Sequence, residues 1–338
     1  MSSEAQAFEE ALAKLAPRLG AGAPQLAGVR RLSGGATQEV WRVDLDGEQG
    51  AEPLILRRAP GGLRVSENAI GLETEARLIE AAAATGTPVP SVRYVLRPED
   101  GLGHGFFMGF VEGETLGGRI VKSPALADAR QGLARSCGEA LARIHAIDPA
   151  GFPNLRRSAA SDLVDQWRAI YHASDWPRPV FELAFRWLDE RCPPPPARPR
   201  LVHGDFRNGN LMIGPDGLRA VLDWELAHVG DPMEDLGWIC VNAWRFGAED
   251  RPVGGFGQRE ELWAGYEAAG GDKVDRAAAH WWEVYGALRW GCMCSGMAMS
   301  FRGADPTVER AVIARRTSET EIDLVRLLVP RTDGGRDG

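Results

Sequence analysis

The stretch LVHGDFRNGNLMIGPDGLRAVLDWELAHVGDP, residues 201–232, combines short apolar runs with many polar groups. RLVH and AVLDW have the composition of short strands and GPDG that of a tight turn, so residues 211–223 are predicted to form a hairpin. Such a hairpin brings Asp205, at the exit of one strand, close to Asp223, at the exit of another. Two neighbouring carboxylates repel each other unless a cation neutralises them. The stretch therefore indicates a cation site.

The ligand atoms indicate which cation the site would hold. Asn210 adds a neutral oxygen ligand to the carboxylates of Asp205 and Asp223, and no Cys/His pair lies nearby in the sequence. Hard oxygen ligands suit Mg²⁺ far better than zinc. The five cysteines of the chain are scattered and show no paired CxxC spacing, so neither a zinc site nor a disulfide framework is expected.

The composition of the 338-residue chain limits the class of protein. Hydrophobic residues make up 44% and charged residues 25%, which are ordinary values for a globular protein with a sizeable core. The net charge of −8 argues against a nucleic-acid binder, which usually has a basic face. The N-terminal segment has the pattern of an amphipathic helix and not of a signal peptide, and no apolar run is long enough to span a membrane. We therefore expect a cytoplasmic protein that binds neither nucleic acid nor membrane.

The first third of the chain is predicted to be rich in strands. TQEVWRVDLDG, PLILRRAP, SVRYVL and GFFMGFV have the composition and length of strands. Between them, ETEARLIEAAAATG predicts a helix with Leu72, Ala76, Ile79 and Ala83 on one face and a stop at Gly86. These segments predict a small α+β lobe.

The rest of the chain is predicted to be mainly helical. RQGLARSCGEALARIHAIDP places Leu133, Cys137, Leu141 and Ile144 on one face of a long amphipathic helix. Further helices are expected over residues 161–173, 179–191, 232–245, 258–269, 275–300 and 306–328. The change of pattern predicts an α+β chain with domains 1–112 and 113–338, and a ligand site in the cleft between them.

The polar residues of the opening stretch occur in a recognisable order. H-G-D-x-x-x-x-N is followed by D-W-E-x-x-x-x-G-D-P-x-x-D-L within residues 203–236. This pattern resembles that of the aminoglycoside phosphotransferase/choline kinase family, a small-molecule branch of the protein-kinase-like fold. The resemblance implies two lobes: a small antiparallel β lobe with one inserted helix, and a larger, mainly helical lobe. LSGGATQEVWRV, LILRRAP and TGTPVP further resemble the kinase-like domains fused to acyl-CoA dehydrogenases.

The family resemblance implies a role for each polar residue of the stretch. Asp205 resembles the catalytic aspartate that accepts or orients the proton of the substrate hydroxyl, and Asn210 and Asp223 resemble the ligands of Mg²⁺. Asp231 and Asp235 are expected to cap helices and brace the loop. The residues expected to support the loop or contact substrate are His203, Arg207, Asn208, Glu225, Asp231 and Asp235.

The first lobe is expected to hold a cation and a partner acid for the nucleotide phosphates. The lysine of the protein-kinase pattern falls on Arg57, with Arg58 as the alternative register. Arginine also pairs with phosphates, but it is bulkier than lysine and not a neutral exchange. The acid is expected to be Glu75, with Glu73 as the second candidate.

Backbone groups of the first lobe complete the expected nucleotide site. A Ser-Gly-Gly turn can lie over phosphates through its N–H groups, and the segment that joins the two lobes would face adenine. The residues concerned are Ser33, Gly34 and Gly35 at the turn, and Phe110, Val111 and Glu112 at the joint.

Together these features predict an ATP- and Mg²⁺-dependent phosphotransferase that acts on a hydroxyl of a small molecule. Two acceptors stay open, an alcohol resembling a hydroxyacyl-CoA and an amino sugar. The arginine at position 57 motivates one alternative, a nucleotide-binding pseudoenzyme with a regulatory or scaffold role. A protein kinase is disfavoured because no room for an activation loop follows Asp223. Neither the choice between ATP and GTP nor the oligomeric state follows from the sequence.

Overall fold

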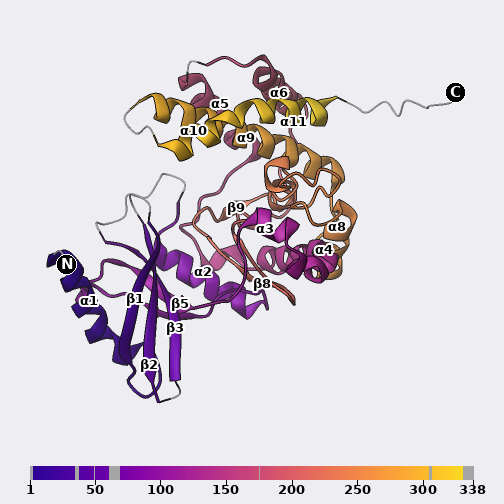
Figure 1. Ribbon diagram of the computed structural model, residues 1–338. Coiled ribbons are helices and arrows are strands. Elements are labelled where there is room, and N and C mark those ends of the chain that lie inside the picture. The colour runs from indigo at the N-terminus through magenta and orange to yellow at the C-terminus, as the bar shows by residue number, and fades with distance from the viewer. Residues whose placement is uncertain are drawn as a thin grey trace.

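The computed structural model describes residues 3–34, 38–48, 50–60, 69–174, 176–303 and 307–329 and has two lobes (Figure 1). The first lobe contains a five-stranded antiparallel sheet of order β1-β2-β3-β5-β4 with two helices. Its elements are α1 (Ser3–Leu15), β1 (Gln25–Gly34), β2 (Glu39–Gly47), β3 (Gly50–Ala59), α2 (Leu72–Ala84), β4 (Val92–Val95) and β5 (His104–Gly109). This is the predicted sheet with one inserted helix, preceded by the amphipathic helix α1.

Alternating side chains give the sheet two different faces. On β3, Leu54 and Leu56 are fully buried in a core cluster with Leu12 of α1. Successive side chains of a strand point to opposite faces, so Ile55 and Arg57 point the other way, into the cleft between the lobes, where both line one cavity. The alternation therefore determines which face of β3 carries the predicted phosphate-binding cation.

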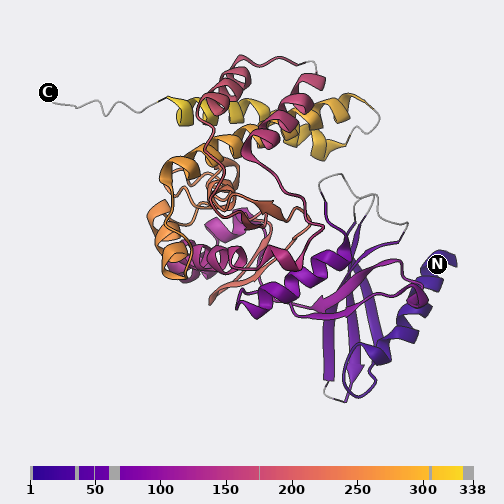
Figure 2. The same ribbon diagram turned by 180° about the vertical axis from the view of Figure 1, so that it is seen from behind.

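Helix α2 lies between the sheet and the second lobe (Figures 1 and 2). Leu72, Ala76 and Ile79 are buried as predicted, but Ala83 is exposed and Ala82 is buried in its place. The larger core cluster includes this face of α2 together with residues of the second lobe. The two lobes therefore share one core across the cleft.

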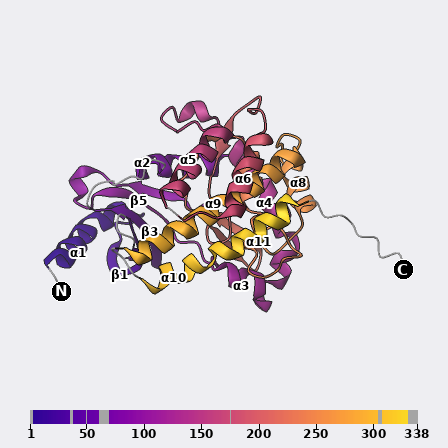
Figure 3. The same ribbon diagram turned by 90° about the horizontal axis from the view of Figure 1, so that it is seen from above.

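The second lobe is mainly helical and contains two short, two-stranded antiparallel sheets. β6 pairs with β9, and β7 pairs with β8 in the hairpin predicted over residues 211–223. Seen from above, α10 projects over the first lobe (Figure 3). The elements are α3 (Gly117–Lys122), α4 (Ala127–His145), α5 (Ala160–Ala173), α6 (Pro179–Glu190), β6 (Arg200–Val202), β7 (Leu211–Gly214), β8 (Gly217–Val221), β9 (His228–Gly230), α7 (Met233–Trp238), α8 (Arg259–Ala268), α9 (Arg276–Arg302), α10 (Val308–Arg315) and α11 (Thr317–Leu328).

Two of the predicted helices have different bounds in the structure. The helix expected over 232–245 ends at Trp238, and the chain is extended at Val241, where φ is −59° and ψ is 135°. Arg245 donates to the carbonyl oxygen of Cys240, at 2.6 Å from Nη2, and so satisfies a group that a longer helix would have bonded. The helix expected over 306–328 is divided at Arg316 into α10 and α11.

Candidate active site

Asp205 lies in a loop that begins where β6 ends. The preceding Gly204 has φ of +80°, and a Cβ there would lie 2.6 Å from the carbonyl oxygen of Leu226, so only glycine fits the turn. The loop is tied to the hairpin by a backbone bond of 2.8 Å, in which Leu222 N–H donates to Asn210 O. The fold therefore brings Asp205 and Asn210 next to the segment that contains Asp223.

Three side chains donate hydrogen bonds to the carboxylate of Asp205. Nε of Arg207 and Nε1 of Trp238 both lie 2.9 Å from Oδ1, and Nδ2 of Asn210 lies 2.6 Å from Oδ2. Arg207 and Asn210 were predicted members of the site, whereas Trp238 was not. Its position within the helix predicted over 232–245 carried no signal, because the contact depends on how α7 packs against the loop.

Asp223 follows β8 and has a left-handed backbone conformation, with φ of +63°. This conformation is rare for residues other than glycine, and aspartate tolerates it better than most because its short polar side chain can bond locally. Its Oδ1 accepts from Nη2 of Arg57 at 2.8 Å. Residues in such conformations cluster at functional sites, which agrees with the expected metal ligand.

Arg57 is the arginine that faces the cleft. Its guanidinium lies 3.3 Å from Glu75, 2.8 Å from Asp223 and 3.2 Å from Glu225. Burial alone would lower the pKa of Arg57, but the nearby carboxylates raise it above the ordinary value. Arg58, the alternative register, instead pairs with Glu39 at 2.9 Å on the other side of the sheet. Three carboxylates therefore converge on one cation.

Glu75 is the acid of α2 that reaches Arg57. Only 1% of it is exposed, and burial raises its pKa to about 7. Its Oε1 accepts from Trp224 N–H at 3.3 Å, while Oε2 lies 3.3 Å from Nε of Arg57 and has no hydrogen-bond partner among the described residues. Glu73, the second candidate, has a side chain that is 64% exposed and lies 3.5 Å from His104. The structure thus places Glu75, and not Glu73, in the site.

The charges and oxygen atoms of the site fit a divalent cation. One guanidinium cannot neutralise Glu75, Asp223 and Glu225, and burial, together with the charge of Asp223, raises the pKa of Glu225 as well. Nδ2 of Asn210 faces Asp205, so its Oδ1 is the amide atom left for a metal. Within the described parts of the chain, no three His, Cys, Asp or Glu side chains form a complete metal site. The residues therefore fit an ion whose remaining ligands come from phosphate and water.

A cavity of about 400 Å³ opens onto these residues between the lobes. Its polar lining includes Arg57, Glu75, Asn210 and Asp223, and Ile55 is among its apolar walls. Phe110 and Val111 of the predicted adenine-facing segment also line it, as does Leu32 of β1. The cavity therefore joins the expected adenine and phosphate residues.

Four other residues predicted for the nucleotide site do not line the cavity or lie outside the described residues. Glu112 is not among the residues that line the cavity, and its carbonyl oxygen accepts from Nη1 of Arg219 at 2.8 Å. Ser33 and Gly34 form the end of β1. Gly35 lies outside the described residues.

Asp235 braces the loop that carries Asp205. Its carboxylate accepts from the N–H groups of His203 at 2.8 Å and Gly204 at 2.9 Å, and it lies 3.0 Å from Nε2 of His145. Burial would raise the pKa of Asp235, but the hydrogen bond and charge of His145 hold it below the ordinary value. Burial also lowers the pKa of His203, whose Nε2 donates to Leu222 O at 3.1 Å.

Asn208 and Asp231 fasten neighbouring segments. Nδ2 of Asn208 donates to the carbonyl oxygens of Trp244 at 3.0 Å and Gly254 at 2.6 Å. Oδ1 of Asp231 accepts from Met233 N–H at 2.9 Å and so caps α7. Oδ2 of Asp231 accepts from Nε1 of Trp282 on α9 at 2.9 Å.

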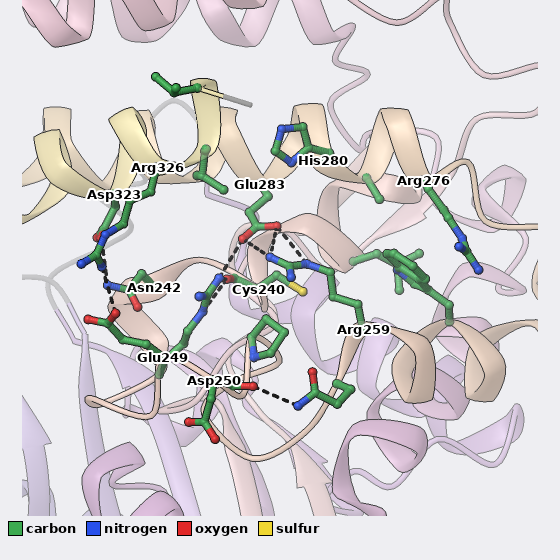
Figure 4. Close-up of a pocket in the computed structure, with 18 residues that line it drawn as sticks. Cys240, Asn242, Glu249, Asp250, Arg259, Arg276, His280, Glu283, Asp323 and Arg326 are labelled. Carbon is green, nitrogen blue, oxygen red and sulfur yellow. Dashed lines mark hydrogen bonds and ion pairs between the residues drawn. The ribbon is translucent and has the colours of Figure 1, made fainter. Parts of the chain in front are cut away.

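A larger cavity lies elsewhere in the helical lobe. It has a volume of about 660 Å³ and contains none of the predicted site residues (Figure 4). Its charged groups largely pair with one another: Glu283 accepts from Arg245 at 2.8 Å and from Arg259 at 2.7 Å, and Arg326 lies 3.0 Å from Glu249. The smaller cavity between the lobes is therefore the one that adjoins the predicted chemistry.

The fold and the arrangement around Asp205 define a two-lobed, kinase-like protein. The chain belongs to the phosphotransferase enzyme family (APH), because the family model matches residues 28–271. Among curated proteins it is 31% identical over 199 residues to acyl-CoA dehydrogenase family member 10 of Mus musculus, covering 56% of this chain and 18% of that protein. It is 30% identical over 221 residues to acyl-CoA dehydrogenase family member 11 of Gallus gallus, and this match covers 62% of this chain and 27% of that protein. The chain thus corresponds to a minor part of the length of these relatives.

Solved structures have the same fold over almost the whole chain. One is a protein of Ralstonia eutropha JMP134, provisionally assigned as an aminoglycoside phosphotransferase. The comparison gives a TM-score of 0.73 at 21% identity and covers 94% of this chain and 97% of that protein's chain. Spectinomycin phosphotransferase in complex with ADP and spectinomycin has a TM-score of 0.61 at 13% identity, covering 90% and 94%. At these identities the likeness shows the fold alone. Among the described residues, no helix is both long and apolar enough to cross a bilayer.

Proposed function

We propose that this chain transfers the γ-phosphate of ATP to a hydroxyl group of a small molecule. The observation that carries the proposal is the cavity of about 400 Å³ that is lined by Arg57, Asn210 and Asp223. In this proposal residues 1–112 hold the nucleotide, and residues 113–338 supply the loop of Asp205 and the acceptor site. Mg²⁺, held by Asn210 and Asp223, would neutralise charge on the β- and γ-phosphates.

The residues of the chain perform the remaining steps by positioning. Asp205 orients the acceptor hydroxyl and takes its proton as the hydroxyl oxygen bonds to the γ-phosphorus. The bond between that phosphorus and the bridging oxygen breaks, and ADP leaves. Arg57 donates hydrogen bonds from its guanidinium group to the phosphates in the cavity. Such positioning and charge stabilisation account for most of the catalysis expected of this reaction type.

The acceptor is proposed to be an alcohol that resembles a hydroxyacyl-CoA. Similarity to acyl-CoA dehydrogenase family members supports this class. The alternative acceptor, an amino sugar, would require free carboxylates near Asp205. Glu225 is the acid whose charge interacts with that of Asp205, and it is already paired with Arg57 at 3.2 Å.

The alternative of a nucleotide-binding pseudoenzyme has no observation in its favour among the described residues. It was motivated by the arginine at position 57. That guanidinium contacts both Glu75 and Asp223, which is the pairing expected of the family's cation. We therefore retain catalysis as the proposal.

Thermal unfolding with and without Mg-ATP tests the nucleotide site. A ligand at a concentration of about 100 times its Kd stabilises a protein by about 2.7 kcal/mol, which corresponds to a Tm increase of about 4 °C for a chain of this length. We expect this shift in the native chain and in Asp205→Asn, and its loss in Asp223→Asn. The acceptor is then tested by measuring ATP turnover with a panel of hydroxyacyl thioesters and amino sugars. Turnover with amino sugars alone would refute the proposed acceptor, and no Mg-ATP shift in the native chain would refute the proposed donor.

A further inference from the structure

Trp238 is a buried side chain that contacts the predicted catalytic group. It is the last residue of α7, 3% of it is exposed, and its Nε1 lies 2.9 Å from Oδ1 of Asp205. A tryptophan in a core needs only one partner for its single N–H group. Here that partner is the carboxylate on which the proposed transfer depends.

The hydrogen bonds to Asp205 distinguish its two oxygen atoms. A carboxylate oxygen has two lone pairs in the plane of the group. Oδ1 accepts from both Arg207 and Trp238, whereas among the described residues Oδ2 accepts from the side chain of Asn210 alone. Within that part of the chain Oδ1 is therefore fully occupied, and Oδ2 keeps one lone pair free.

We propose that Trp238 is a positioning residue of the transfer reaction, which occupies Oδ1 together with Arg207 so that Oδ2 receives the proton of the acceptor. This inference rests on the proposed function. The O–H bond of the acceptor breaks, its proton moves to Oδ2, and its oxygen bonds to the γ-phosphorus while ADP leaves. Trp238 touches neither nucleotide nor acceptor in this scheme and acts through Asp205.

Neighbouring groups hold the indole ring in its orientation. The guanidinium of Arg289 lies 4.3 Å from the ring centroid, and its Nη1 donates to Gly204 O at 3.2 Å. Trp244 meets the ring edge-on with 5.2 Å between centroids. On α9, Gly286 lies so close that a Cβ there would be 2.9 Å from the Cε3 atom of the indole. The ring is thus fixed by packing from α9 and by the loop that it supports.

Loss of the indole N–H group should affect turnover more than nucleotide binding. Terminal carboxylate torsions have broad energy wells, so Asp205 would rotate more freely without this donor. Loss of one hydrogen bond to a charged group lowers the rate by about 10- to 100-fold. Trp238 lies outside the set of residues that line the nucleotide cavity. We therefore expect kcat to fall by about 10- to 100-fold with KM for Mg-ATP unchanged within about 2-fold.

Trp281→Phe provides the matched control for Trp238→Phe. Trp281 is 2% exposed, and its Nε1 donates to Leu188 O at 3.0 Å, away from the candidate site. Each substitution removes one buried indole and one hydrogen bond. Hydrolysis of Mg-ATP, with water as the acceptor, is measured for both full-length variants beside the Tm shift with Mg-ATP. We expect the loss of kcat in Trp238→Phe alone, with the Tm shift kept in both.

A second variant keeps the test decisive if Trp238→Phe does not fold. Trp238→His retains an N–H donor at this position and should turn over faster than Trp238→Phe and more slowly than the native chain. Equal turnover in Trp238→Phe and Trp281→Phe, or a Trp238→His variant that folds but loses the full 10- to 100-fold of kcat despite its N–H group, would overturn the positioning role. A native chain that shows no hydrolysis and no transfer would instead overturn the proposed function, so the two failures are distinguishable.

Discussion

Arg57 carries one positive charge among three carboxylates, and this arrangement distinguishes the two adjacent arginines of β3. Its Nη2 contacts Asp223 and Glu225, at 2.8 and 3.2 Å, while its Nε side faces Gln38 and Glu75. A lysine ammonium is a compact charge and cannot reproduce contacts made from two sides of a planar fork. The residue therefore links β3 to α2 and to the hairpin of the second lobe.

Arg57→Lys is expected to weaken Mg-ATP binding. Losing one hydrogen bond to a charged group corresponds to about 10- to 100-fold in affinity, so KM for Mg-ATP should rise by that factor. Arg58→Lys is the matched control, because Arg58 lies on the same strand and pairs with Glu39 instead. Steady-state kinetics on both variants make the comparison. An equal KM in the two variants would contradict the assigned register.

Glu75→Gln is expected to change how stability depends on pH. Burial raises the pKa of Glu75 to about 7 from an ordinary value of 4.5. Between these values the folded chain holds more protons than the unfolded chain, so this group makes the free energy of unfolding fall as pH rises. The decrease in the free energy of unfolding is complete above about pH 7 and amounts to about 3 kcal/mol at most. Glutamine does not titrate, so the substitution removes this pH dependence of the free energy of unfolding.

Urea unfolding at pH 5 and pH 8 measures the effect. The native chain should lose more stability between these pH values than Glu75→Gln. Glu73→Gln, an exposed neighbour on the same helix, should behave as the native chain does. If the stability of Glu75→Gln depended on pH as that of the native chain does, the pKa of Glu75 would not be raised on folding.

At the scale of elements, Asp235 connects three parts of the helical lobe. From α7 it accepts hydrogen bonds from the backbone that follows β6, at His203 and Gly204, and it pairs with His145 at the end of α4. These contacts fix the start of the loop that carries Asp205. Helix α4 was predicted correctly from its buried face, but its pairing with Asp235, 90 residues away in the sequence, depends on tertiary packing.

Asp235→Asn is expected to destabilise the chain strongly. The amide N–H group would face a backbone N–H or His145 in place of one carboxylate oxygen, and breaking a buried pair costs about 3–5 kcal/mol. Because the pKa of Asp235 is lowered, its contribution is present above the unfolded pKa and is lost only as pH falls below it. Urea unfolding at pH 7 measures the change.

Asp272→Asn is the control for that variant. Asp272 forms an exposed ion pair of 3.0 Å with Arg200 on β6, and exposed pairs contribute about 0–1 kcal/mol. Similar stability losses in the two variants would show that Asp235 does not brace the loop.

The bounds of the elements follow from the sequence only where local signals are strong. The apolar face of α4, with Leu133, Cys137 and Leu141, has helical spacing and is buried as predicted. The segment after Trp238 has no glycine or proline to stop a helix, yet the helix ends there, because the Cys240 carbonyl bonds to Arg245. That partner is set by tertiary geometry and not by a local stop signal.

At the scale of the whole molecule, the two lobes share the larger hydrophobic core. Leu72 and Phe106 of the first lobe belong to the same cluster as Trp224 and Leu236 of the second. Backbone bonds also cross between the lobes, from Ile70 N–H to Glu225 O at 2.9 Å. The proposed boundary at residue 112 therefore divides the chain by role and not by core.

We expect a single cooperative thermal transition for the full chain. Because the larger core spans both lobes, separating them would expose its apolar surface, so neither lobe should unfold alone. Differential scanning calorimetry should give one peak whose calorimetric enthalpy equals the van't Hoff enthalpy. Two peaks, of which Mg-ATP moves only one, would contradict a shared core.

The two-lobed fold class and the grouping of polar residues between His203 and Leu236 could be predicted from the sequence. Hydrophobic periodicity and a dense local motif carry that information, because both depend on neighbouring residues. That Arg57 and Glu75 face the cleft, and that Trp238 reaches Asp205, depends on the tertiary structure. These contacts join residues far apart in the chain, and the physical reason is packing: the register of β3, the burial of α2 and the close approach of α7 to α9 set the directions of side chains that no local pattern specifies.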